Sequence, residues 1–503
     1  MTTGKTHSYI CYLILLVLAF TWNAYMCTMS PLREVVFSPD ANCFYMAGKC
    51  MALGYVPYVD FVDTKGPLLF VVYMLGYLLS PDKTLGVYII ASLATFITFI
   101  LLFKIGKLYN LKNQQAILAV LFCSLFLFYR PIYGYGGRAE QFMLPVIVWI
   151  MYTATKIAIP SDTILQNWKH FAISVGSGAG IILFCKFNYI VYPVGTLLLS
   201  SLLIYKNQEA KEVCKLIAKY VFLSFLIITI PIVIYLVCVH AFDAFIQVYF
   251  KLSASNALPG KEQGIMAKIE QIENLYLSWM RRDETLWVFG SILLLFSSFY
   301  SKKTVRNAPL FLFLSSVTLI LGSYLGLYRY YSLMILPLLI FFTITLISKF
   351  RLNGASTAII TLLVMIWGVD SNYKRPNEAY LKKVQQIKEP GLCKDFSKIE
   401  KIIASKKRAK ILYIDFLGTG FSIRTGALPA CPNWFYLNKA DKSTLESAYA
   451  AIEQGKADFV ISRSNYRDKW RLEQSGYKVT AKFLEGEYCR GAMLLWSKED
   501  IKI

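Results

Sequence analysis

Charged side chains that could take part in a group-transfer reaction gather in one polar segment near the start of the chain. Asp40, Asp60, Asp63 and Lys65 all lie between two long apolar runs. A carboxylate near an interface can take a proton from an incoming hydroxyl or amine, and a nearby cation can hold a phosphate leaving group. In the alternative interpretation, Asp40 only begins a helix, and Asp60 and Asp63 form a turn bridged to Lys65.

The sequence around these side chains predicts two helices joined by a constrained turn. Ser38 is a good N-cap and Pro39 fits the first position of a helix over about 40–53. Asp40 then lies in the first turn, where the helix dipole favours its ionised form. A second helix begins at Pro67, so the other acids and the lysine fall on the turn between the two helices.

The composition is that of a membrane protein. Of 503 residues, 56% are hydrophobic and 17% are charged, and the mean hydropathy is +0.48. A soluble chain would carry nearer a quarter charged residues, which excludes an ordinary soluble or disordered protein. The net charge of +22 does not indicate a nucleic-acid partner, because long uncharged runs are typical of membrane spans and excess Lys and Arg lie near anionic headgroups of membrane lipid.

The apolar runs predict an α-helical polytopic membrane protein with about eleven spans. The first is an uncleaved signal-anchor helix, because no good cleavage site follows it. Residues 67–80 are apolar but short, and could form a re-entrant helix, an interfacial helix or a further span. The predicted spans are 9–27, 85–103, 115–128, 140–159, 171–185, 188–204, 220–240, 285–300, 308–327, 331–348 and 355–370.

Basic residues in short loops predict the orientation. Lys and Arg dominate the loops around 104–112, 206–219, 302–306 and 349–351, which fall on one side of the membrane with this number of spans. By the positive-inside rule the N-terminus is cytoplasmic in the cell membrane. The loops 28–83, 129–139 and 241–283 then face outward. An amphipathic helix over 265–282 in the last of these could be a lid or a membrane anchor.

The tail has soluble patterning and predicts a second domain. Residues 1–372 form the transmembrane domain in this interpretation, and residues 375–503 form a small α/β domain outside the membrane. Strands are expected at 410–415, 458–462 and 491–496, and a helix at 443–455.

Further charged residues lie where predicted spans meet the outer surface. Arg138 and Glu140 lie at the mouth of one span, where unpaired ions are costly; the alternative is that they pair with each other on the surface. Lys186 and Arg329 also lie at outward ends of spans and could bind a phosphate. Lys186 could instead extend toward water.

The first outward loop resembles that of the GT-C integral-membrane glycosyltransferases. Asp40 precedes the segment 54–68, which reads Gly-Tyr-Val-Pro-Tyr-Val-Asp-Phe-Val-Asp-Thr-Lys-Gly-Pro-Leu. The loop looks closest to the group of bacterial aminoarabinose transferases and protein O-mannosyltransferases. Asp63 and Lys65 correspond to the acidic-Lys-Pro motif of that group, with the different spacing Asp-Thr-Lys-Gly-Pro.

The resemblance implies roles for these residues. Asp40 would be the catalytic base, and Glu140 would help to shape the donor and acceptor site. Lys65, Arg138, Lys186 and Arg329 would bind the donor phosphate. Asp63 and His240 could hold a divalent metal ion, although two protein ligands are few and donor phosphate would complete the shell. An interfacial histidine is the commoner explanation of His240.

The function expected from this resemblance is transfer of a sugar to a cell-envelope acceptor, which could be a lipid, a glycan or a protein. The donor would be a polyprenyl-phosphate sugar, and a single displacement would invert the anomeric centre. A polysaccharide polymerase or ligase is an alternative, and a lipid-carrier flippase is another. A flippase is disfavoured because the spans are nearly free of charges and the acids lie on loops.

Overall fold

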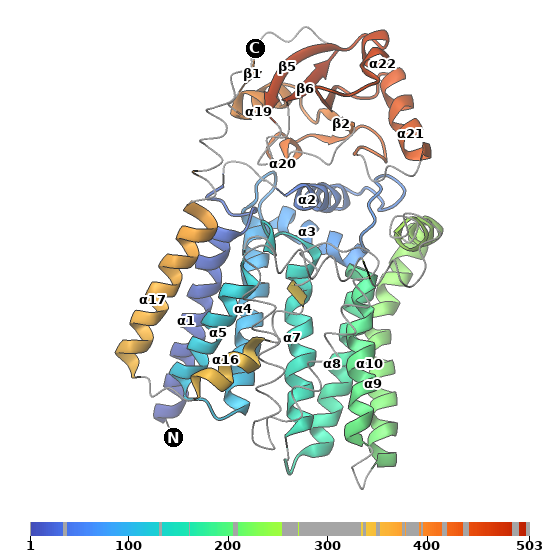
Figure 1. Cartoon of the computed structure of the whole chain (residues 1–503). Coiled ribbons are helices and arrows are strands. Elements are labelled where there is room, and N and C mark those ends of the chain that lie inside the picture. The colour runs from blue at the N-terminus through green and yellow to red at the C-terminus, as the bar shows by residue number, and fades with distance from the viewer. Residues whose placement is uncertain are drawn as a thin grey trace.

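The computed structural model describes most of the helical and sheet elements of the chain. It describes residues 2–33, 38–129, 133–159, 161–204, 210–253, 270, 333–334, 339–348, 353–374, 378, 392–393, 396–414, 420–435, 442–484 and 492–498. A bundle of long helices forms one end of the molecule and a sheet with its own helices forms the other (Figure 1).

Long apolar helices build the bundle. Its members are α1 (Thr2–Met26), α4 (Leu85–Leu108), α5 (Asn113–Leu127), α7 (Ala139–Ala158), α8 (Ile164–Cys185), η1 (Phe187–Ile190), α9 (Val191–Ile204), α10 (Ala210–Cys238), α16 (Ile340–Ile347) and α17 (Gly354–Val369). Among the described residues, α1, α4, α7, α8 and α10 make five helices that are long and apolar enough to cross a membrane. Short elements continue two members, namely α11 (Phe242–Phe245) and η2 (Ile246–Leu252) after α10, and η5 (Asp370–Lys374) after α17.

The predicted spans agree with these helices wherever the structure describes them. Each predicted span up to 220–240, and the last at 355–370, lies on a helix of the bundle. The span predicted at 331–348 overlaps α16, whereas 285–300 and 308–327, and all but Glu270 of the amphipathic helix 265–282, lie outside the described residues. The number of eleven spans therefore stays a prediction.

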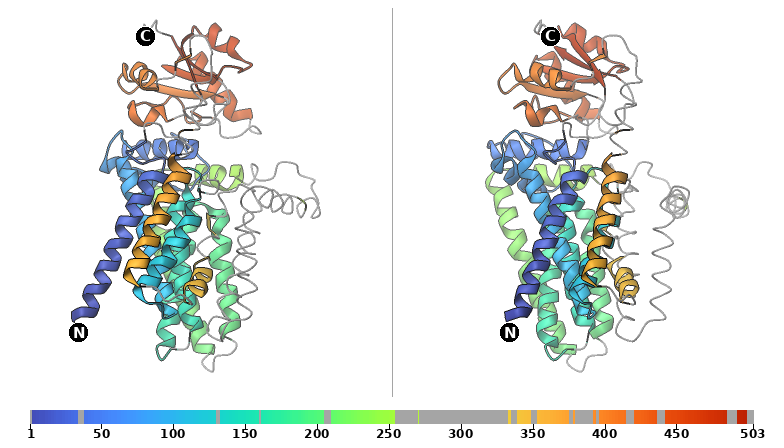
Figure 2. Two further views of the ribbon diagram at one scale, coloured as in Figure 1. Left: turned by 60° about the vertical axis from the view of Figure 1, so that its left-hand side comes forward. Right: turned by 90° about the vertical axis from the view of Figure 1, so that its left-hand side faces the viewer.

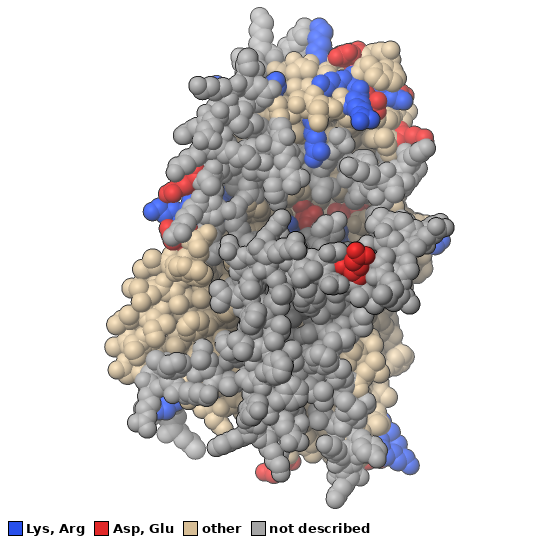
Figure 3. All heavy atoms as spheres, viewed as in Figure 1, with Lys and Arg blue, Asp and Glu red and all other residues tan. Residues whose placement is uncertain are grey.

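The outer surface of the bundle is apolar, as a surface in contact with lipid must be. On α10, Phe222 and Ile227 are 61% and 70% exposed, and on α17 Leu362 and Leu363 are 61% and 60% exposed. Charged side chains of the described residues gather instead on the sheet and at the far end of the bundle (Figure 3).

Two shorter helices, α2 (Pro39–Ala52) and α3 (Pro67–Leu79), lie between the bundle and the sheet (Figures 1 and 2). The hydroxyl of Ser38 accepts a hydrogen bond from the amide of Ala41 and caps α2, as predicted. Both helices begin with a proline, whose fixed φ suits the first helical turn. Residues 67–80 therefore form a short helix at the end of the bundle.

The C-terminal part contains a six-stranded mixed sheet in the order β1-β5-β6-β4-β2-β3. Its strands are β1 (Leu392–Cys393), β2 (Lys410–Ile414), β3 (Leu428–Pro429), β4 (Phe459–Arg463), β5 (Lys478–Leu484) and β6 (Ala492–Ser497), and its helices are α19 (Phe396–Ala404), α20 (Phe421–Arg424), α21 (Lys442–Glu453) and α22 (Lys469–Gln474). The strands predicted at 410–415, 458–462 and 491–496 and the helix at 443–455 are confirmed. Strand β6 lies in the interior of the sheet, between β5 and β4, and is buried along its length.

The sheet is docked on α2 and on the loop that follows it. Arg424 donates a hydrogen bond of 2.6 Å to the carbonyl oxygen of Arg33, and the amide of Val62 donates one of 3.0 Å to the carbonyl oxygen of Pro432. The ammonium of Lys49 on α2 lies 3.4 Å from the carbonyl oxygen of Ser422. The loop that follows α2 is therefore held between the bundle and the sheet.

Candidate active site

Asp40 lies at the N-terminal end of α2, facing the start of α7. Its carboxylate Oδ2 is 3.5 Å from the guanidinium Nε of Arg138, and the two side chains are 31% and 17% exposed. The structure thus brings together a partly accessible carboxylate and a cation 98 positions apart in the sequence. An accessible acid oriented by a cation is suited to accept a proton from a bound substrate.

Asp63 and Lys65 lie on the turn between α2 and α3. Asp63 is 3% exposed, and its Oδ1 accepts a 3.0 Å hydrogen bond from the amide of Lys65. Burial raises the pKa of Asp63 to about 6, and the negative charge of Asp40 contributes to the same direction, so the two carboxylates are close enough to interact. Asp63 is therefore bridged to Lys65 as predicted, but through the backbone amide of Lys65 and not through its ammonium group.

The ammonium of Lys65 is available to a ligand. It donates a 3.2 Å hydrogen bond to the hydroxyl of Thr64 and lies 5.6 Å from the ring centre of Phe44. Within the part of the chain that the structure describes, it forms no ion pair. Half-buried and without a carboxylate partner there, Lys65 is the cation of the turn best suited to a phosphate.

Glu140 at the start of α7 and Lys186 at the end of α8 form a buried ion pair. The Nζ–Oε1 distance is 2.5 Å and the side chains are 2% and 9% exposed. The hydroxyl of Tyr189 donates a 3.0 Å hydrogen bond to the same oxygen of Glu140. The predicted surface pair of Glu140 with Arg138 is therefore wrong, because Glu140 is buried against Lys186 while Arg138 faces Asp40. Lys186 does not extend to water.

Polar contacts fix the segment that carries Arg138. The hydroxyl of Tyr73 on α3 donates a hydrogen bond to the carbonyl oxygen of Gly137. The amide of Gly137 donates one of 2.8 Å to the side chain of Gln141, which in turn donates to Asn23 of α1 at 2.8 Å. Side chains of α1, α3 and α7 therefore position the residue that contacts Asp40.

The turn is also joined to α8. The amide of Gly66 donates a 3.0 Å hydrogen bond to the carbonyl oxygen of Cys185, the residue before Lys186. A side chain at position 66 would collide with the carbonyl oxygen of Phe184, so only glycine allows this close approach. This contact joins the turn to the residue that precedes Lys186 of the buried ion pair.

The structure does not unite all of the predicted residues. His240 is exposed after α10 and has a left-handed backbone conformation (φ 54°), whereas its predicted co-ligand Asp63 is buried. Within the described ranges, no group of three or more His, Cys, Asp or Glu side chains could hold a metal ion. Asp63 and His240 alone do not make a metal site. Arg329 lies outside the described residues.

Some contributors to the site could not be recognised from the sequence. Tyr189 contacts Glu140, and Tyr73 holds the segment before Arg138. The only available signal for Tyr189 was its position one helical turn after Lys186. Tyr73 lies in an apolar helix, where a tyrosine is unremarkable, and nothing in the sequence distinguishes it.

The fold and the apolar helices are those of an integral-membrane protein, and the comparisons with known proteins show which fold the chain resembles. The family model described as "Dolichyl-phosphate-mannose-protein mannosyltransferase" matches residues 64–235. The predicted resemblance to the aminoarabinose-transferase and mannosyltransferase type is confirmed by this match and by the solved structures below.

Two solved structures share the fold over nearly the whole chain. One is ArnT from Cupriavidus metallidurans in the apo state, with a TM-score of 0.62, 10% identity and 99% of each chain covered. The other is the same enzyme bound to undecaprenyl phosphate, with a TM-score of 0.58, 12% identity and 98% of each chain covered. No curated protein matches the chain in sequence.

Proposed function

We propose that the protein is a membrane glycosyltransferase that moves a sugar from a polyprenyl-phosphate-linked donor to a cell-envelope acceptor at the outer face. The family match supports glycosyl transfer, and the ArnT structure that binds undecaprenyl phosphate supports a lipid-linked donor. The acceptor is a lipid, a glycan or a protein of the envelope.

The geometry of Asp40 carries this proposal. It is an accessible carboxylate, 3.5 Å from Arg138, and its charge acts on buried Asp63. An acid used only to begin α2 would need neither contact, because the N-terminal dipole alone accounts for such a residue.

In the proposed reaction, Asp40 takes the proton of the acceptor while the acceptor oxygen or nitrogen attacks the anomeric carbon of the donor sugar. The bond from that carbon to the phosphate oxygen breaks, and the polyprenyl phosphate leaves with the bonding electrons. This single displacement inverts the anomeric centre.

Cations stabilise the departing phosphate. Lys65 is the principal candidate, because it forms no ion pair with the described residues. Arg138 is already paired with Asp40 at 3.5 Å, and Lys186 is paired with Glu140 at 2.5 Å. We therefore assign Arg138 to orienting the base, and the Glu140–Lys186 pair to shaping the donor end of the site. Arg329 remains a further proposed phosphate contact.

The test is the substitution Asp40→Asn in the full-length protein. Loss of a general base lowers the rate on the order of a hundredfold or more. Turnover is measured with polyprenyl-phosphate sugar and native envelope acceptor, alongside the unfolding temperature in detergent. We expect the rate to fall while the unfolding temperature stays within a few degrees of the unsubstituted protein.

The matched control is Glu212→Gln. Glu212 is an exposed acid, paired with Lys215 at 3.2 Å, at the opposite end of the bundle from Asp40. It should leave the rate unchanged. Near-normal turnover by Asp40→Asn contradicts the assignment of the base.

A further inference from the structure

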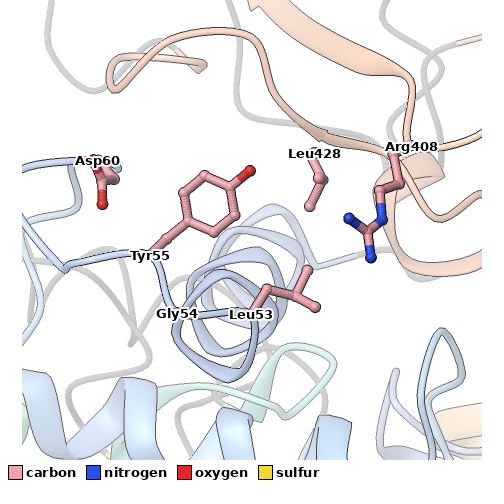
Figure 4. A pocket seen from close by; sticks show the side chains of 6 residues that line it. All are labelled: Leu53, Gly54, Tyr55, Asp60, Arg408 and Leu428. Atoms are coloured by element: carbon pink, nitrogen blue, oxygen red, sulfur yellow. The ribbon is translucent and has the colours of Figure 1, made fainter.

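A cavity separates the end of α2 from the sheet, away from the residues assigned above. It measures about 410 Å³ and is lined by Leu53, Gly54, Tyr55, Asp60, Arg408 and Leu428 (Figure 4). Pockets that bind small molecules commonly measure about 300–1,000 Å³, so a single sugar unit fits. The loop after α2 supplies one wall and the sheet supplies the other.

Arg408 has the features of a binding residue. Its backbone is in the left-handed region (φ 54°), which non-glycine residues seldom adopt without a structural or functional reason. Its exposed guanidinium points into the cavity (Figure 4). Among the described residues it forms no hydrogen bond or ion pair, whereas nearby Lys406 is paired with Asp458 at 2.8 Å.

The opposite wall of the cavity carries a hydrogen-bond acceptor, the carboxylate of Asp60, and the aromatic ring of Tyr55. One oxygen of Asp60 accepts a 2.7 Å hydrogen bond from the amide of Val56, which fixes the carboxylate. The ammonium of Lys410 donates a 3.4 Å hydrogen bond to the hydroxyl of Tyr55. This contact helps to fix the position of the aromatic ring. The other carboxylate oxygen accepts no hydrogen bond from the described residues.

We propose that this cavity binds an anionic sugar unit of the acceptor, with Arg408 as the residue that holds the anion. This inference rests on the proposed function. A guanidinium binds a carboxylate or a phosphate through two parallel hydrogen bonds, the Asp60 oxygen accepts from a sugar hydroxyl, and the ring of Tyr55 receives the apolar face of the sugar. A neutral sugar would leave Arg408 without a partner, and a bare anion would be repelled by Asp60.

The distance between the cavity and Asp40 indicates the size of the acceptor. Asp40 lies at one end of α2 and the cavity at the other. Because α2 has 14 residues, this separation is about 20 Å. The recognised unit is therefore distant from the atom that attacks the donor, and the acceptor is an extended molecule of several units rather than a monosaccharide.

The test measures binding of defined sugars to the full-length protein in nanodiscs of phosphatidylcholine. Saturation-transfer NMR is recorded with glucuronate, glucose 6-phosphate and glucose. We expect transfer to both anionic sugars and much less to glucose. Arg408→Ala should lower the signal at least fivefold, Arg408→Lys should retain part of it, and Lys407→Ala, an exposed neighbour outside the cavity, should leave it unchanged.

Several results overturn the inference. One is equal signals from Arg408→Ala and the unsubstituted protein, and another is equal binding of glucose and glucuronate. Displacement of glucuronate by inorganic phosphate at equal concentration reduces the cavity to a simple anion site. Displacement by phosphatidylglycerol in the nanodisc assigns it to a lipid headgroup.

Sugar transfer measured on the same preparations separates this inference from the proposed function. If transfer depends on Asp40 but no anionic sugar binds, the cavity assignment fails and the enzyme assignment stands. If glucuronate binds through Arg408 but no transfer occurs with any envelope acceptor, the enzyme assignment fails.

Discussion

Asp63 is a buried carboxylate whose ionisation has a cost. Its pKa is raised from 3.8 to about 6 by burial. Between these values the folded protein keeps a proton that the unfolded chain has lost, so this residue lowers stability as the pH rises from about 4 to about 6. Above pH 6, ionisation of Asp63 lowers the free energy of unfolding by roughly 3 kcal/mol in full.

The substitution Asp63→Asn should therefore stabilise the protein in a pH-dependent way. The amide can still accept the hydrogen bond from Lys65 but cannot ionise. The unfolding temperature of the variant should match that of the unsubstituted protein near pH 4, rise above it through pH 6, and stay constantly higher at pH 7 and beyond. Thermal unfolding followed by tryptophan fluorescence measures this difference.

Asp162→Asn serves as the control, because Asp162 is an exposed carboxylate. A difference between Asp63→Asn and the unsubstituted protein that is the same at pH 4 and pH 7 contradicts the raised pKa.

At the scale of elements, one ion pair joins α2 to the turn after α3. Lys49 is 2% exposed and its Nζ lies 2.6 Å from Oδ1 of Asp82, which is 39% exposed. The two partners are thus unequally buried. Removing the exposed partner leaves a buried charge without its counter-ion, whereas removing the buried partner leaves a carboxylate that water can solvate.

The substitution Asp82→Asn should consequently lower the free energy of unfolding more than Lys49→Met does. We expect a loss of about 3 kcal/mol for the first and about 1 kcal/mol or less for the second, since methionine fills similar space. Asparagine tolerates the left-handed backbone of position 82 (φ 54°), so strain does not confuse the comparison. Unfolding in denaturant measures both.

The double variant tests the reasoning. Once Lys49 is methionine, the charge at position 82 has lost its partner, and Asp82→Asn should cost little more. If the losses in free energy of unfolding add up in the double variant, the Lys49–Asp82 ion pair is not the cause of the loss in Asp82→Asn.

At the scale of the whole molecule, the two ends of the bundle differ in charge. Lys104 and Lys107 at the end of α4 and Lys211 and Lys215 at the start of α10 lie at the end opposite the sheet (Figure 1). With the positive-inside rule, this end is expected in the cytoplasm and the sheet outside.

Cysteine labelling tests this orientation. With Cys214, Cys238, Cys393, Cys431 and Cys489 replaced by serine, a membrane-impermeant maleimide should label Lys456→Cys, in the exposed turn before β4, in right-side-out vesicles. It should label Lys215→Cys only after the vesicles are opened. The reverse pattern would put the candidate site on the cytoplasmic side and contradict transfer at the outer face.

Local signals in the sequence predicted the elements well. Ser38 and Pro39 marked the start of α2, Pro67 marked the start of α3, and short apolar runs marked β2 and β4. Capping and burial patterns are local properties, so a single sequence carries them. The candidate acids were found for the same reason, because charges beside apolar runs stand out.

Partners within the site could not be predicted. Asp40 meets Arg138, and Glu140 meets Lys186 at a separation of 46 positions, because helices far apart in the sequence are packed together. Sequence proximity instead suggested that Arg138 and Glu140 pair, which is wrong. The docking of the sheet on α2 likewise depends on tertiary contacts such as that of Arg424 with the backbone of Arg33.

The hydrogen bond between Gly66 and Cys185 has a bearing on how substrates enter. It couples the acidic turn rigidly to the end of α8, so those two walls cannot separate without breaking a backbone contact that admits no side chain. If the protein acts as proposed, the acceptor and the lipid carrier are therefore expected to enter without separating this turn from the end of α8.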